Sequence, residues 1–75
     1  SRANLRGAVL TRANLRGANL TRAHLTRTDL TRTDLEGADL TRAKLRGANL
    51  DRAVADRNTI WPEGFDPKAT GVIFY

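Results

Sequence analysis

Hydrophobic positions recur along this chain with a period of five residues. A leucine stands at every fifth position without a gap, and a small residue, Ala or Thr, precedes each leucine by two positions. The residue immediately before the leucine is usually Asn or Asp, and the two residues after it are polar, charged or glycine. The leucines of this ladder are Leu5, Leu10, Leu15, Leu20, Leu25, Leu30, Leu35, Leu40, Leu45 and Leu50.

A period of five fits neither a regular helix nor a flat strand. In an α-helix, at about 100° per residue, successive leucines would spread around the axis. In a flat strand, an odd spacing would send them to opposite faces. The chain must therefore turn once per repeat and coil around an axis, with the leucines inside. Stacked coils bury leucines that no single unit can bury alone, which predicts a solenoid.

The turn of each repeat has its own sequence signal. Asn and Asp before the leucine suit a bend, because their side chains hydrogen-bond to nearby backbone. Gly7, Gly17, Gly37 and Gly47 stand where the turn could need a positive φ, and Arg occupies this position in the other repeats. We therefore expect a turn that does not always require glycine.

The units ANLRG, ANLTR, TDLTR and ADLTR resemble the pentapeptide-repeat family, whose motif is A(D/N)LXX, from residue 1 to about residue 55. The resemblance implies an all-β fold, a right-handed quadrilateral β-helix with four pentapeptides per coil, and a protein without catalytic activity. Some members mimic DNA and inhibit type II topoisomerases. The segment 61–67, WPEGFDP, resembles the end of many cyanobacterial members.

The pattern divides the chain into a β-helix over residues 1–57 and a capping tail over residues 58–75. All four aromatic residues lie in the tail: Trp61, Phe65, Phe74 and Tyr75. We expect them to cover the end of the leucine stack, with an aromatic recognition patch as the alternative. Ala55 stands where a leucine is due and should thin the core. No comparable cap precedes Ser1, so we expect upstream sequence or end-to-end association there, and a fragment or C-terminal domain of a larger protein.

The chain has few side chains that common catalytic sites use. It contains no Cys, one His (His24) and one Ser (Ser1), so no Ser/His/Asp or Cys/His system can be assembled. His24 is alone and is interpreted as solvated, since metal sites need several converging ligands. We predict no enzyme activity, no cofactor and no metal site. The sequence has neither an apolar span nor a signal peptide; its compartment is unknown, with the cytoplasm favoured.

Charge is unevenly distributed: the chain carries 13 Lys+Arg against 8 Asp+Glu, a net charge of +5. With four repeats per coil, residues twenty apart share a face. The first face (3–7, 23–27 and 43–47) carries Arg6, Arg27, Lys44 and Arg46 and no acid, whereas the other faces mix both signs. Arg22 and Arg42 fall on the fourth face. Like charges on rungs about 4.8 Å apart repel unless an anionic partner is present.

Two functions follow from these patterns. The leading hypothesis is a non-catalytic structural or protein-interaction scaffold. The alternative is a binder of an anionic partner, either nucleic acid or an acidic surface, through Arg6, Arg27, Lys44 and Arg46; a merely solvated basic face also stays open. The first face has no aromatic residue to stack on a base, which weakens a single-strand reading. DNA mimicry is disfavoured because it needs a strongly negative surface.

Overall fold

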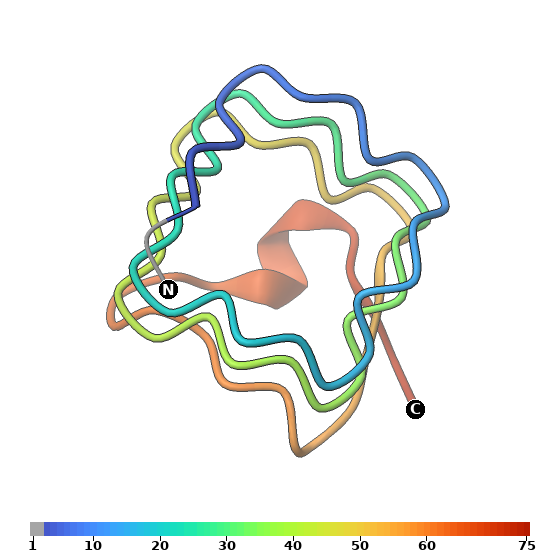
Figure 1. Ribbon diagram of the computed structural model, residues 1–75. Helices are drawn as coiled ribbons and strands as arrows, with labels where there is room; N and C mark the ends of the chain where they lie inside the picture. The colour runs from blue at the N-terminus through green and yellow to red at the C-terminus, as the bar shows by residue number, and fades with distance from the viewer. Residues whose placement is uncertain (1–2) are drawn as a thin grey trace.

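In the computed structural model, which describes residues 3–75, the chain winds as stacked four-sided coils (Figure 1). Parallel bridges join positions twenty residues apart, one on each side of the coil: Asn4 with His24, Val9 with Asp29, Asn14 with Asp34 and Asn19 with Asp39. Three of these columns continue to Lys44, Asn49 and Val54. The twenty-residue spacing means that each coil holds four pentapeptides.

Regular secondary structure is brief. The strands β1 (Val54–Ala55) and β2 (Ile73–Phe74) form a parallel pair, with Val54 opposite Ile73 and Ala55 opposite Phe74. One 3₁₀ helix, η1 (Pro67–Thr70), lies between them in sequence. Elsewhere the coils are held by single bridges, because the chain turns again before a longer strand can form.

Backbone hydrogen bonds between coils repeat one pattern. The Leu25 N–H donates to the Lys44 carbonyl at 2.8 Å, and the Lys44 N–H donates to the Ala23 carbonyl at 2.9 Å. A third bond joins the corners, as from the Arg27 N–H to the Arg46 carbonyl at 2.9 Å. Each coil thus pairs with the next as one parallel strand pairs with another.

The corners combine a side-chain hydrogen bond with a left-handed residue. Asn14 Oδ1 accepts from the Arg16 N–H at 3.1 Å, and each of the six other Asn and Asp residues before a leucine accepts in the same way from the N–H two residues later. The residue two positions after each leucine has φ between 58° and 72°. Gly and Arg share this position, so the turn accepts arginine in the left-handed conformation that favours glycine.

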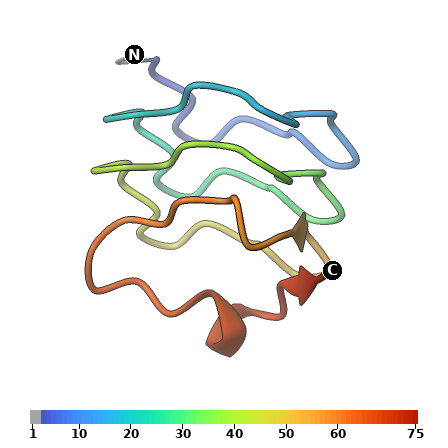
Figure 2. The ribbon, with the colours of Figure 1, turned by 90° about the horizontal axis from the view of Figure 1, so that it is seen from below.

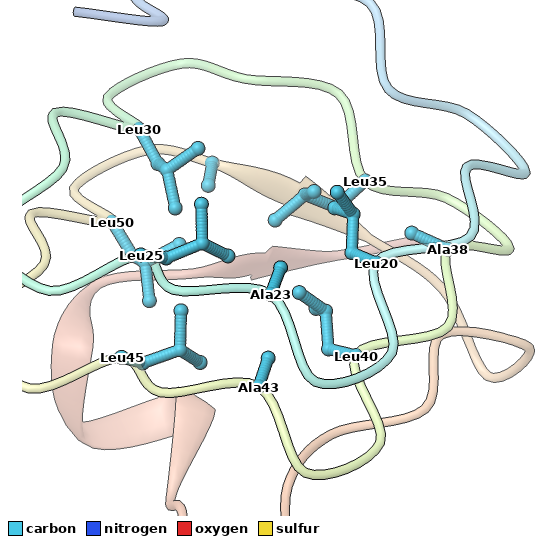
Figure 3. Close-up of a cluster of buried hydrophobic side chains, with 11 residues drawn as sticks. Leu20, Ala23, Leu25, Leu30, Leu35, Ala38, Leu40, Ala43, Leu45 and Leu50 are labelled. Carbon is cyan, nitrogen blue, oxygen red and sulfur yellow. The ribbon is translucent and has the colours of Figure 1, made fainter. Parts of the chain in front are cut away.

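The leucine ladder fills the interior (Figure 3). Leucines of the second coil, such as Leu25, Leu30 and Leu35, are fully buried, whereas Leu5 and Leu10 of the first coil are only partly buried. Thr33, which replaces Ala at the small position, is also fully buried. Its hydroxyl donates to the Leu10 carbonyl of the preceding coil at 2.8 Å, so the buried polar group is satisfied.

The tail leaves the repeat register and then crosses below the last coil (Figure 2). Asp39 pairs with Ile60 rather than with residue 59, so the corner after β1 holds one extra residue. Trp61 follows in the column of Leu20 and Leu40. The chain then runs through η1 and returns at β2, beside β1. The predicted boundary after residue 57 stays a prediction, although the bridge pattern continues to Ile60.

The aromatic residues of the tail take different places. Trp61 and Phe65 pack against the core, with their rings stacked at 5.4 Å between centroids. Phe74 meets Trp61 edge-on at 6.5 Å. Tyr75 is 80% exposed and takes part in neither of these ring contacts. Ala55, where we expected a thinner core, is fully buried because β2 pairs beside it.

Candidate binding surface

Three of the four basic residues predicted on the first face line one open groove. Its volume is about 740 Å³, and it is lined by Arg6, Gly7, Thr26, Arg27, Arg46 and Gly47. We call it the arginine groove. The three arginines come from three successive coils, which the corner bonds from Gly7 to Thr26 and from Arg27 to Arg46 hold in line. Gly7 and Gly47 are exposed and have no side chain to cover the backbone of the groove.

Lys44, the fourth predicted residue, lies in a separate groove. This groove of about 300 Å³ is lined by Arg22, His24, Arg42 and Lys44, and we call it the lysine groove. From the sequence we placed Arg22 and Arg42 on another face and left His24 in solvent. The repeat spacing could have placed Arg22 and Arg42 beside Lys44. The residue two positions after a leucine forms the corner, so its side chain lies beside the next face.

Within residues 3–75, the arginines of the arginine groove have no carboxylate partner. The one ion pair within residues 3–75 joins Arg16 Nε to Asp34 Oδ2 at 3.8 Å, on the third face. No Asp or Glu is among the residues that line the arginine groove. Positive charge on successive coils is therefore not neutralised from within, and the side chains must be balanced by solvent ions or by a partner.

Carboxylates gather instead on the third face, across the coil. Partial burial raises the pKa of Glu36, and the neighbouring Asp34 raises it further. Asp56 is also partly desolvated, which acts to raise its pKa, but hydrogen bonds from the Gly37 and Asn58 N–H groups prevail and hold that pKa below its ordinary value. The third face therefore differs from the arginine groove, because its carboxylates lie together and one of them pairs with Arg16.

The grooves offer charge rather than reactive groups. Across the described part of the chain, no cluster of His, Asp or Glu residues is arranged to hold a metal ion. Within residues 3–75, no helix is long and apolar enough to cross a membrane. What the arginine groove can do chemically is hold an anion, because guanidinium groups bind carboxylates and phosphates through planar pairs of hydrogen bonds.

Comparison with known proteins gives the family. The pentapeptide repeat family, in 8 copies of the repeat, matches residues 1–37 and 18–54. Comparison with curated proteins found no match. The chain is similar to the crystal structure of alr5209, a pentapeptide repeat protein from Nostoc PCC 7120, with 32% identity and a TM-score of 0.69; the match covers 100% of this chain and 74% of that protein.

A second solved structure is similar over a shorter stretch. It is the pentapeptide repeat protein Rfr23 from the cyanobacterium Cyanothece 51142, with 40% identity and a TM-score of 0.72. The match covers 77% of this chain but only 43% of Rfr23, so the chain spans less than half of that protein. With repeats matched over most of its length and two such structural neighbours, the chain belongs to the pentapeptide repeat family.

Proposed function

We propose that this chain is a non-catalytic interaction module that binds an acidic protein through the arginine groove. The observation that carries the proposal is the convergence of Arg6, Arg27 and Arg46, from three coils, on an open groove lined by no carboxylate. The scaffold would be the right-handed quadrilateral β-helix that the family resemblance implies. Members of this family are generally structural or interaction modules rather than enzymes, which supports the proposal.

Affinity would come from several modest contacts. An exposed ion pair contributes about 0–1 kcal/mol, so no single arginine dominates. Three guanidinium groups on neighbouring coils can act together, and glycine at positions 7 and 47 lets a partner approach the backbone. Because the groove is open to solvent, salt screens these contacts. We therefore expect binding that weakens steeply as ionic strength rises.

An acidic protein fits the groove better than single-stranded nucleic acid does. The groove has no aromatic side chain on which a base could stack, since the aromatic residues lie in the tail. Carboxylates are planar and match the guanidinium fork without stacking. A DNA duplex, which also presents anions, is the competing ligand in the test.

The test compares two sets of neutralised arginines. Labelled polyglutamate and a labelled DNA duplex would be titrated with the wild-type chain, with R6Q/R27Q/R46Q and with R12Q/R32Q/R52Q. Both triples remove three positive charges, but only the first alters the arginine groove. We expect the first triple to bind polyglutamate roughly tenfold more weakly, on the order of 0.5 kcal/mol per arginine, and the second to change affinity much less.

Two outcomes would contradict the proposal. Equal losses for both triples would mean that net charge alone attracts the ligand. Tighter binding of the duplex than of polyglutamate, with the same dependence on Arg6, Arg27 and Arg46, would assign the groove to nucleic acid. Circular dichroism of each variant confirms that the coil is retained.

A further inference from the structure

The last coil carries unpaired backbone groups at the edge of the first face. Earlier coils satisfy the corresponding groups: the Leu25 N–H donates to Lys44, and Ala23 accepts from Lys44. The same groups recur one coil later as the Leu45 N–H, the Gly47 N–H and the Ala43 carbonyl. Within residues 3–75, none of these three has a hydrogen-bond partner.

The tail passes by this edge without pairing with it. After Ile60 it crosses below the coil (Figure 2) and rejoins the stack where the Arg52 N–H donates to the Gly71 carbonyl at 3.0 Å. Its strand β2 then pairs with β1 on the third face. The first face is therefore left as an open strand edge, which is a template for another extended chain.

A groove runs between this edge and the tail. Its volume is about 420 Å³, and seven of its ten lining residues are apolar or glycine; we call it the tail groove. It is lined by Ala43, Leu45, Arg46, Gly47, Ala48, Pro62, Glu63, Gly64, Phe65 and Thr70. Its lining includes Ala43, Leu45 and Gly47, the three residues whose backbone groups are unpaired.

We propose that the tail groove binds an extended acidic peptide, which adds to the edge 43–47 as a parallel strand. The preceding coils define its register. One peptide residue would accept from the Leu45 N–H and donate to the Ala43 carbonyl, and the residue two positions later would accept from the Gly47 N–H. The residue between them would point inward, toward Leu45 and Phe65. Main-chain bonds would supply affinity and the alternating side chains specificity.

Charge selects the acidic peptide over other occupants. The two outward peptide residues would stack beside Lys44 and Arg46, where opposite charges are favourable and like charges are not. A second copy of this chain, docked by its first coil, would place Arg6 beside Arg46. Glu63 is the one carboxylate that lines the groove, and it opposes an acidic ligand. The charge argument rests on the proposed function, whereas the strand register does not.

N-methylation of a peptide tests the register. The probe is a fluorescein-labelled peptide, acetyl-Gly-Ala-Glu-Leu-Glu-Gly-Gly-amide, in which the first Glu lies opposite Lys44. Methylating the nitrogen of that Glu removes the donor to Ala43, and we expect roughly tenfold weaker binding, the effect of one lost bond of about 1–1.5 kcal/mol. Methylating the second Glu is the control, because its counterpart Arg46 donates no bond to a neighbouring coil.

Side-chain variants test the charges of the groove. We expect Glu63→Gln to strengthen binding of the unmethylated peptide about two- to threefold, Arg46→Gln to weaken it by a similar factor, and Arg12→Gln to leave it unchanged. Equal affinities for both methylated peptides would overturn strand addition, while the salt-dependent binding of polyglutamate could still uphold the arginine groove. If methylation of the first Glu weakened peptide binding but R6Q/R27Q/R46Q did not, strand addition to the edge 43–47 would be upheld and the contribution of the arginines would not.

Sedimentation of the peptide-free chain tests whether a second copy of the chain, instead of a peptide, covers the edge. A dimer that the peptide fails to dissociate would mean that a second copy covers the edge, which overturns the proposal. A species that becomes monomeric as peptide binds, or is monomeric throughout, supports it.

Discussion

At the scale of single residues, the turn position has a defined conformational cost. Gly17 has φ +66°, and a Cβ built there would meet no atom within 4 Å. Only the backbone conformation therefore separates glycine from alanine at this site. We expect Gly17→Ala to lower the free energy of unfolding by about 1 kcal/mol. Urea unfolding measures this, with Arg32→Gly as the reciprocal variant, expected to be neutral or stabilising; a Gly17→Ala chain as stable as wild type would contradict the strain.

The sequence predicted some residues of this fold and not others. The alternation of Gly and Arg indicated a turn that tolerates both, and all of these positions have positive φ. Thr28 and Thr33 looked like departures from the small-residue pattern. Their burial became understandable only with the coil before them in place, because each hydroxyl donates to a leucine carbonyl that is far away in sequence.

At the scale of the repeat, the corners make stability depend on pH. The hydroxyl and the N–H of Thr31 donate to Asp29 and lower its pKa, as Thr41 does for Asp39; hydrogen bonds from backbone N–H groups also lower the pKa of Asp56. A lowered folded pKa contributes stability above the unfolded value, about 3.9, which is lost as pH falls through the folded pKa. Glu36 has the opposite sign, because its raised pKa stabilises the fold only at acid pH.

The three carboxyl groups with a lowered pKa should affect the pH dependence of stability more than the one with a raised pKa. We expect the urea midpoint to fall as the pH is lowered below about 4, where the unfolded chain would bind protons that the folded chain resists. In Asp29→Asn/Asp39→Asn, the side chain keeps the oxygen that accepts from the corner N–H, as Asn14 does. That variant should lose part of the acid dependence; an unchanged pH profile would argue against the corner bonds as its source.

In the tail, the five-residue repeat no longer predicts the structure. Its aromatic residues were predicted to cover the leucine stack, and Trp61 and Phe65 do pack against the core. The extra residue in the corner before Ile60 could not be predicted from the sequence. One inserted residue shifts the repeat by one position but does not change the order in which small and apolar residues follow one another. Thr59 stabilises that corner by donating its hydroxyl to the Leu35 carbonyl at 2.8 Å, a contact that exists only between stacked coils.

At the scale of the whole molecule, sorting charges by face predicted that Arg6, Arg27 and Arg46 share one face, but it predicted no groove. Arg6, Arg27 and Arg46 meet as the twenty-residue spacing indicated. Lys44 lies instead with Arg22 and Arg42, since corner residues belong to two faces at once. The tail groove could not be predicted at all, because it depends on the path by which residues 61–72 cross below the last coil.

The stack should also unfold as one unit, although its coils are not equally buried. Leu10 and Leu30 occupy the same column, but only Leu30 is fully buried. We expect Leu30→Ala to lower the free energy of unfolding by about 3–5 kcal/mol and Leu10→Ala by clearly less. Removing the Leu30 side chain leaves a cavity inside the middle coil, whereas solvent reaches the space left by the partly buried Leu10.

Trp61 is the single tryptophan and lies in the cap, so its fluorescence reports on the last coil while circular dichroism reports on the whole chain. Since each coil contacts only its neighbours and this stack is short, the two signals should change together in urea. If Trp61 changed at lower urea than the dichroism, the cap would be unfolding alone, and the cost of Leu30→Ala would then belong to the coils without it.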